Sequence, residues 1–249
     1  MCMVGVAGAE RCVDALFISP NTRFYLRCRH LPFQSIIYRM MATSNHDLAL
    51  LRAEVAARAA RMIAEDGADY AGAKRRALRL VLGNAAHQPA SNLLPDNAEV
   101  EAAVRNYQAL FQAASQPPRL RALRLLAVEV MQQLAQFRPY LTGAVLNGTA
   151  GEHDDVHLQL FADSVKDVIL FLLGRDVSVE ISATAHFKGP RHDPVETASF
   201  YWRKQQVHAE LYEMNDLRGV LKPRPDGRVQ RADLNAVRAL LAADDNPGT

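Results

Sequence analysis

The hydrophobic pattern of the chain changes its period at Pro139. Before this residue, apolar side chains recur at the spacing of one helix face, as in Val100, Val104 and Tyr107. After it, apolar and polar residues alternate, as in residues 156–161, which is the pattern of a strand with one buried face. A helical first half followed by a mixed second half predicts an α+β fold.

Start and stop signals place the elements within each half. Capping residues and Gly or Pro breaks predict helices from Ser44 to Asp66, from about Tyr70 to Leu82, after Asp96 or Asn97, after Gln116-Pro117-Pro118, from Ser164 to Gly174, and around Leu234, Val237 and Leu240. Alternation predicts strands at Leu141 to Leu146, Val156 to Phe161 and Val177 to Ile181, and a hairpin of Phe200 to Arg203 with Val207 to Tyr212. On the hairpin, Val207, Ala209 and Leu211 are expected to face the core, with His208 and Glu210 on the opposite side.

Residues 1–40 differ from the rest of the chain. They hold all three cysteines and five arginines against two acidic residues, and their hydrophobic pattern has no clear period. We therefore predict three parts: an extension over residues 1–40 outside the fold, a helical region over 41–138, and an α+β domain over 139–249. An Arg-rich targeting or docking arm is the alternative interpretation of the extension.

Composition bounds the class of protein. With 49% apolar residues the chain can bury a core, yet its longest apolar runs are far shorter than the roughly 18 residues of a membrane-spanning helix. The cysteines form no CxxC pair, so neither a disulfide framework nor a cysteine metal site is expected. The basic run at residues 74–76 lacks interleaved aromatics and a basic surrounding, so a nucleic-acid partner is not supported. We expect a cytoplasmic protein with no membrane partner.

One polar stretch interrupts the second half. Residues 142–161 read TGAVLNGTAGEHDDVHLQLF, in which Gly143 and Gly148 are five positions apart and Asp155-Val156-His157 follows. This order resembles the nucleotidyltransferase superfamily with the DNA polymerase beta-like fold. That family is marked by Gly-Ser, a second glycine five positions on, an Asp-x-Asp strand and a third acidic residue on a later strand. The resemblance covers about residues 139–215.

The resemblance implies a site and its ligands. It implies phosphate binding at Gly143, Ala144, Gly148 and Thr149, a divalent metal ion at Asp155 and His157, and a catalytic set of Asp155, His157, His208 and Glu210. Residues two apart on a strand share a face, so an Asp-x-Asp pair can hold Mg²⁺ against a triphosphate. The implied activity is metal-dependent transfer of a nucleoside monophosphate from a nucleoside triphosphate to an acceptor that the sequence does not identify.

Three positions depart from the family's pattern. Ala144 replaces the serine, which removes one phosphate donor, and His157 replaces the second aspartate with a nitrogen that suits Zn²⁺ or Mn²⁺ better than Mg²⁺. On the hairpin, His208 occupies the natural position of the later acid, with Glu210 two residues on. The carboxylate set is incomplete, so the sequence predicts that transfer is weak or lost.

Two interpretations of these residues stay open. In one, the loss of carboxylates left a non-catalytic fold that senses a nucleotide or binds a protein partner. In the other, Asp155 and His157 with His208 or Glu210 form a mixed site for a transition metal. A structural turn without function would explain Gly143 and Gly148 but not the polar residues beside them. Phosphate-loop, dinucleotide-binding, hydrolase-elbow and HExxH motifs do not occur in the sequence.

Overall fold

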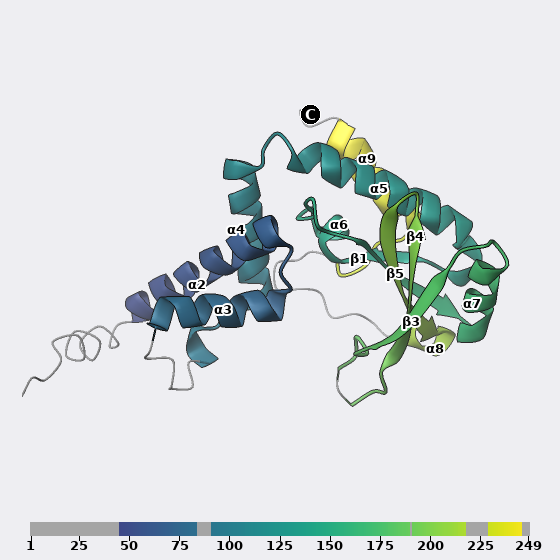
Figure 1. The fold of residues 1–249 in the computed structure, drawn as a ribbon, viewed down its shortest axis with the longest axis horizontal. Helices are drawn as coiled ribbons and strands as arrows, with labels where there is room; N and C mark the ends of the chain where they lie inside the picture. Colours follow the sequence, from purple (N-terminus) through teal and green to yellow (C-terminus); the bar gives the residue numbers. More distant parts are fainter. Residues whose placement is uncertain (1–44, 84–90, 190, 218–228, 246–249) are drawn as a thin grey trace, which may run out of the picture. The chain divides into compact units, whose positions relative to one another are not determined.

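The computed structural model describes residues 45–83, 91–189, 191–217 and 229–245, which belong to one compact unit (Figure 1). The fold is α+β, with helices in the first part and a five-stranded mixed sheet in the second, as the change of hydrophobic period predicts. The expected extension over residues 1–40 lies outside the described residues. Within the described ranges, no helix combines the length and the apolar character that crossing a membrane requires.

Three helices open the described chain: α2 (Asn45–Asp66), α3 (Tyr70–Leu82) and α4 (Asn97–Phe111), with the 3₁₀ turn η2 (Ser91–Leu93) before α4. Caps set their starts, because Asp69 accepts a hydrogen bond from the Gly72 amide at 2.8 Å and Asp96 forms a reciprocal capping box with Glu99. The three helices bury small and branched side chains in a core cluster of their own: Val55, Ala59, Ala60, Ile63, Ala73, Ala77, Val100 and Val104.

Helix α5 (Gln116–Gln133) belongs to a second core. Its Leu123 and Val130 pack in the same cluster as the sheet. Pro117 and Pro118, expected to precede the helix, occupy its first turn, where a missing N–H costs nothing. The 3₁₀ turn η3 (Ala135–Phe137) then leads to the sheet.

The sheet has the strand order β1-β2-β5-β4-β3. Its strands are β1 (Tyr140–Thr142), β2 (Val156–Ala162), β3 (Val179–Thr184), β4 (Val195–Trp202) and β5 (Gln205–Glu213). The β2–β5 pair is parallel and the other neighbours are antiparallel. The remaining helices are α6 (Gly143–Asn147), α7 (Val165–Leu173), α8 (Met214–Leu217) and α9 (Leu234–Asp245). Helix α9 lies beside α5, as Figure 1 shows.

The expected strand from Leu141 to Leu146 is wrong beyond residue 142. Gly143 has a φ of 70°, which residues with a side chain rarely adopt, and it turns the chain from β1 into the short helix α6. The adjacent residues Val145 and Leu146 are both buried, which a helical turn permits and an alternating strand does not. Gly148, with a φ of 82°, ends the helix as a left-handed cap.

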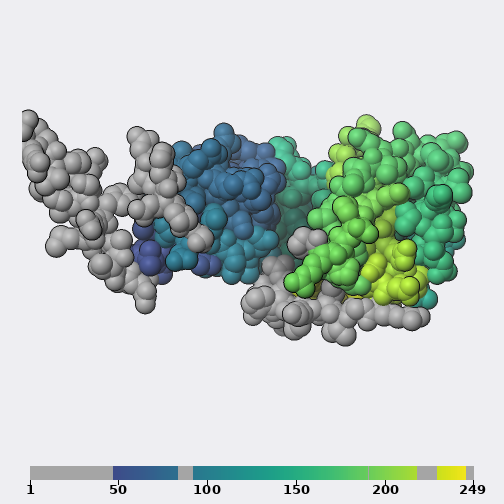
Figure 2. Space-filling view, turned by 90° about the horizontal axis from the view of Figure 1, so that it is seen from below, coloured from purple at the N-terminus to yellow at the C-terminus, as the bar shows by residue number. Residues whose placement is uncertain are grey.

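Three other bounds differ from the sequence expectation. Strand β3 starts at Val179 rather than Val177 and has exposed or half-buried residues throughout, because it is an edge strand. The green atoms of the β3–β4 region lie at the surface in Figure 2. Strand β4 begins at Val195, five residues before the expected start at residue 200. The hairpin turns at Arg203 and Lys204, both with positive φ, so the two glutamines that follow belong to β5.

The sheet has a core face and a polar face. Val207, Ala209 and Leu211 are buried on the core face in the cluster that includes α5, α7 and α9, which confirms the predicted alternation on β5. We define the polar face by two rows of residues that cross the sheet in register. The first row is Thr142, His157, His208, Ser199 and Glu180, and the second is Tyr140, Gln159, Glu210, Thr197 and Ser182.

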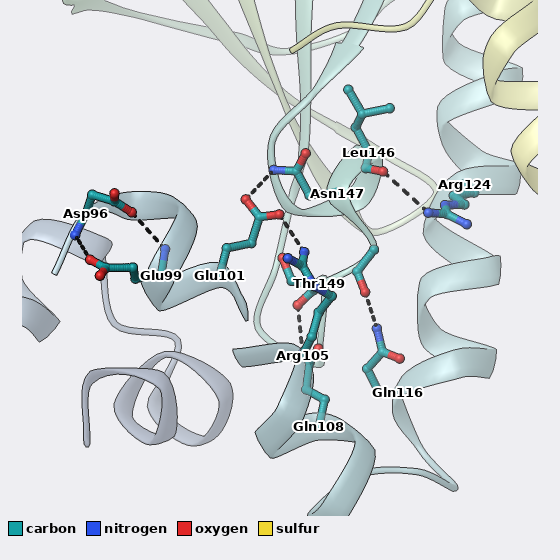
Figure 3. A network of polar contacts seen from close by, with 11 residues as sticks. Asp96, Glu99, Glu101, Arg105, Gln108, Gln116, Arg124, Leu146, Asn147 and Thr149 are labelled. Atoms are coloured by element: carbon teal, nitrogen blue, oxygen red, sulfur yellow. Dashed lines mark hydrogen bonds and ion pairs between the residues drawn. The ribbon is translucent and has the colours of Figure 1, made fainter. Parts of the chain in front are cut away.

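Side chains of α4 and α5 hold the loop between α6 and β2. Gln108 donates to the Thr149 carbonyl at 2.7 Å, and Gln116 donates to the carbonyls of Gly148 and Ala150 at 3.1 and 3.0 Å (Figure 3). In a loop these carbonyls would otherwise need water or other partners. The contacts therefore fix the segment that leads into β2 and the polar face.

Candidate functional site on the polar face

Two histidines lie side by side at the centre of the polar face. His157 on β2 pairs in register with His208 on β5, and their rings are stacked with centroids 5.0 Å apart and an interplanar angle of 24°. Parallel pairing of these strands is what brings together residues that are far apart in the sequence. Both residues were expected in the site, and the structure makes them direct neighbours.

His208 is held between a carboxylate and a hydroxyl. Its Nε2 lies 3.3 Å from Asp155 Oδ2, and its Nδ1 lies 2.8 Å from Ser199 Oγ. A carboxylate can only accept, so Nε2 carries the proton that it donates to Asp155, and in the neutral ring Nδ1 accepts from the Ser199 hydroxyl. Both ring nitrogens are thus engaged and the orientation of the ring is fixed.

Asp155 is engaged from a second side as well. The side-chain amide of Gln205 donates to Asp155 Oδ1 at 2.8 Å, and its oxygen Oε1 accepts from Arg119 at 2.7 Å. Arg119 also donates to backbone carbonyls of the loop before β2, at Gly151, Glu152 and Asp154. A continuous hydrogen-bonded chain therefore runs from Arg119 on α5 through Asp155 to Ser199 on β4.

Glu210 lies in the second row and does not contact Asp155. Its Oε2 accepts from Gln159 at 3.2 Å and from the Tyr212 hydroxyl at 2.8 Å. Burial raises the pKa of Tyr212, and the charge of Glu210 adds to the effect. The carboxylate of Glu210 is thus engaged by Gln159 of its own row and by Tyr212, and the two acids expected to act together have separate partners.

His157 is the available imidazole of the pair. The residue is exposed, and its ring nitrogens make no hydrogen bond to any residue in the described part of the chain. The pKa of His157 is lowered, chiefly because the protein around it partly desolvates the ring, and secondly because its electrostatic interaction with His208 disfavours the charged form. Near pH 7 this side chain is therefore a neutral ring with an acceptor nitrogen and a donor N–H.

The four predicted phosphate-binding residues divide into two pairs. Gly143 and Ala144 lie at the turn beside His157, since a Cβ added at Gly143 would be 3.6 Å from the His157 Cβ. Gly148 and Thr149 lie at the other end of α6, and their backbone N–H groups both donate to the Ala144 carbonyl. As placed here, the second pair has no free backbone donor for a phosphate.

The donor set does not fit a Mg²⁺ site. Mg²⁺ takes oxygen ligands in near-octahedral geometry, whereas the carboxylate of Asp155 is already hydrogen-bonded and its neighbours are imidazoles. The lone pairs of stacked rings lie in nearly parallel planes, so they do not converge on one ion. In the described ranges, no group of three or more His, Cys, Asp or Glu side chains is arranged to hold a metal.

Sequence reasoning missed three residues of this site: Arg119, Ser199 and Gln205. Gln205 was assigned to the hairpin turn, and Ser199 lies before the expected start of its strand. Had β4 been started at Val195, alternation would have placed Ser199 on the polar face, because Phe200 faces the core. No local signal points to Arg119, which reaches the site from α5.

Comparison with protein-family models gives no match, and no curated protein matches the chain.

Proposed function

We propose that this chain is a nucleotidyltransferase-like protein that binds a nucleotide on the polar face, with Mg²⁺-dependent nucleotidyl transfer weak or lost. The observation that carries the proposal is the in-register pair His157 and His208 beside the Gly143 turn. The resemblance implies acidic metal ligands at these strand positions. Here the same positions hold neutral or hydrogen-bonded rings.

Nucleotide binding is supported by the chemistry of the first row. The exposed His157 ring offers a flat surface for a base to stack on, and its nitrogens can form hydrogen bonds with a base or phosphate. Because Gly143 has no Cβ, its turn lies close against the His157 side chain, so the turn and the ring are next to each other on the polar face. These features require no metal ion.

Weak or lost transfer is supported by the charge of the site. Transfer from a triphosphate needs dications held by several carboxylates to neutralise the developing charge. Asp155 is the one carboxylate of the described residues that is bonded to the histidine pair, and Glu210 is engaged by Gln159 and Tyr212.

The test combines binding and turnover. Purified protein is titrated with each nucleoside triphosphate by calorimetry, without metal and with Mg²⁺, Mn²⁺ or Zn²⁺, and pyrophosphate release is followed in parallel. We expect saturable binding that is at least tenfold weaker in His157→Ala, with little or no pyrophosphate in Mg²⁺. Brisk Mg²⁺-dependent release that Asp155→Asn abolishes would make the chain an active transferase instead. Absence of nucleotide binding would favour the alternative, a partner-binding protein.

A further inference from the structure

Arg231 lies at the far end of the polar face among aromatic rings. Its guanidinium carbon is 5.1 Å from the ring centroid of Tyr140, 5.2 Å from that of Phe161 and 5.9 Å from that of Phe187. These distances are those of cation–π contacts. The three rings come from β1, β2 and the segment after β3, so separate elements of the fold converge on this cation.

The backbone around Arg231 is fixed by the sheet. The next residue, Ala232, exchanges two hydrogen bonds with Leu141 on β1, at 2.8 and 3.0 Å. Ala232 and Leu141 are both buried in the main core cluster. The position of the arginine is therefore set by pairing with the sheet rather than by a flexible surface segment.

The guanidinium has a donor nitrogen without an acceptor. Nη2 donates to the Leu217 carbonyl at 3.5 Å, but the buried Nη1 has no hydrogen-bond partner among the residues that the structure describes. An arginine cannot lose its charge, and a buried N–H left without an acceptor costs about 1–3 kcal/mol, more for a charged group. Such a group is an exception in native structures and points to an absent partner.

Neighbouring acids are already used by other partners. Asp216 pairs with Lys188 and lies 3.5 Å from His186, and Glu210 accepts from Gln159 and Tyr212. Among the residues that the structure describes, no carboxylate forms an ion pair with Arg231. The cation thus lies over aromatic rings and has no anionic partner within the described ranges.

Arg231 and His157 lie toward two ends of one face of the sheet. Phe161, whose buried ring contacts the guanidinium, follows His157 by four residues on the same face of β2, a separation of roughly 13 Å along a strand. The Arg231 residue itself is half-buried, so a single elongated ligand can place one part at the exposed His157 and another at the guanidinium. Arginine offers a planar fork of donors that matches a phosphate group.

We infer that Arg231 binds a phosphate group of the ligand that lies on the polar face. This inference rests on the proposed function and deepens it, because it identifies the group that receives the phosphates. The resemblance implied phosphate binding at residues 143–149. There, position 144 is an alanine instead of a serine, and the N–H groups of Gly148 and Thr149 are already hydrogen-bonded, so another group has to bind the phosphate.

The experiment measures binding of ATP and of inorganic tripolyphosphate to the full chain by calorimetry. Arg231→Met is the test variant, and Arg238→Met, which removes an exposed arginine on α9, is the matched control. We expect Arg231→Met to weaken both ligands at least tenfold, which corresponds to about 1.4 kcal/mol, and Arg238→Met to leave both unchanged. Arg231→Lys, which keeps the charge but loses the planar fork, should lie between the wild type and Arg231→Met.

The outcomes separate the two proposals. If tripolyphosphate binds and Arg231→Met abolishes its binding while ATP shows no extra affinity, the phosphate site stands and the nucleotide proposal fails. If ATP binds equally well to the wild type, Arg231→Met and Arg231→Lys, the inference about Arg231 is overturned and the nucleotide proposal stands. If Arg231→Met unfolds, the comparison of Arg231→Lys with the wild type decides: equal affinity for tripolyphosphate would contradict the inference.

Discussion

Replacing Arg124 by methionine is expected to destabilise the protein by about 3 kcal/mol. Arg124 is buried on α5 and donates to the carbonyls of Val145 and Leu146 at 3.2 and 3.4 Å. These are the last carbonyls of α6, which have no partner within a helix. The same guanidinium pairs with both oxygens of Asp244 at 2.8 and 2.6 Å.

The magnitude follows from these contacts. Two carbonyls that lose their donor cost about 1 kcal/mol each, and the ion pair with the partly exposed Asp244 adds about 1 kcal/mol. For a domain of this size, a loss of 3 kcal/mol lowers the melting temperature by roughly 6–12 °C. Because the Arg124 side chain caps the last carbonyls of α6, the variant also loosens the turn that places Gly143 beside His157.

Urea unfolding followed by circular dichroism tests this prediction. The control is Arg58→Met, which removes an exposed ion pair with Glu54 and should change stability by less than about 0.5 kcal/mol. A change of less than 1 kcal/mol in Arg124→Met, with an unchanged slope against urea, would show that α6 does not depend on this arginine.

Three further predictions concern the turn, the histidine and the extension. Gly143→Ala should cost about 1–2 kcal/mol because of the φ of 70°, whereas Gly151→Ala, where φ is not positive and an added Cβ meets its nearest atom at 3.7 Å, should cost less; equal costs would refute the strain argument. The pKa of His157 is lowered from 6.5 in the folded protein, so the unfolded chain takes up the proton first as the pH falls, and stability should decrease below about pH 6.5. In urea titrations at several pH values, His157→Gln should flatten this dependence of stability on pH. An unchanged dependence would contradict the lowered pKa. A chain that starts at Met41 should melt at the same temperature as the full chain; a loss of several degrees in calorimetry would reject an independent extension.

The order of helices and strands could be predicted because most elements carry periodic patterns and caps. The short helix α6 could not, since the apolar run from Ala144 to Leu146 is compatible with either state. What decides is the positive φ of Gly143 and the capping of the last carbonyls by Arg124. Neither the φ of Gly143 nor the contacts of Arg124 can be read from the local hydrophobic pattern.

The histidine pair could be predicted only in part. Alternation placed His208 and Glu210 on one face, but the sequence could not decide which of them meets Asp155. The parallel register of β2 and β5 decides it, because it aligns His157 with His208 and leaves Glu210 beside Gln159. Arg231 gave no signal at all, since it follows a stretch without hydrophobic period and is brought to the polar face by the bridge that the next residue, Ala232, forms with Leu141 of β1.

Nuclear magnetic resonance of the histidine rings tests most directly whether a nucleotide binds on the polar face. The chain has eight histidines, and spectra of His157→Ala and His208→Ala assign the two central signals. On addition of ATP without metal, the signals of His157 and His208 should shift together and saturate, while the signal of the exposed loop residue His153 stays unchanged. Saturable ATP binding that leaves both central signals in place, or shifts only those of other histidines, would contradict the proposed site.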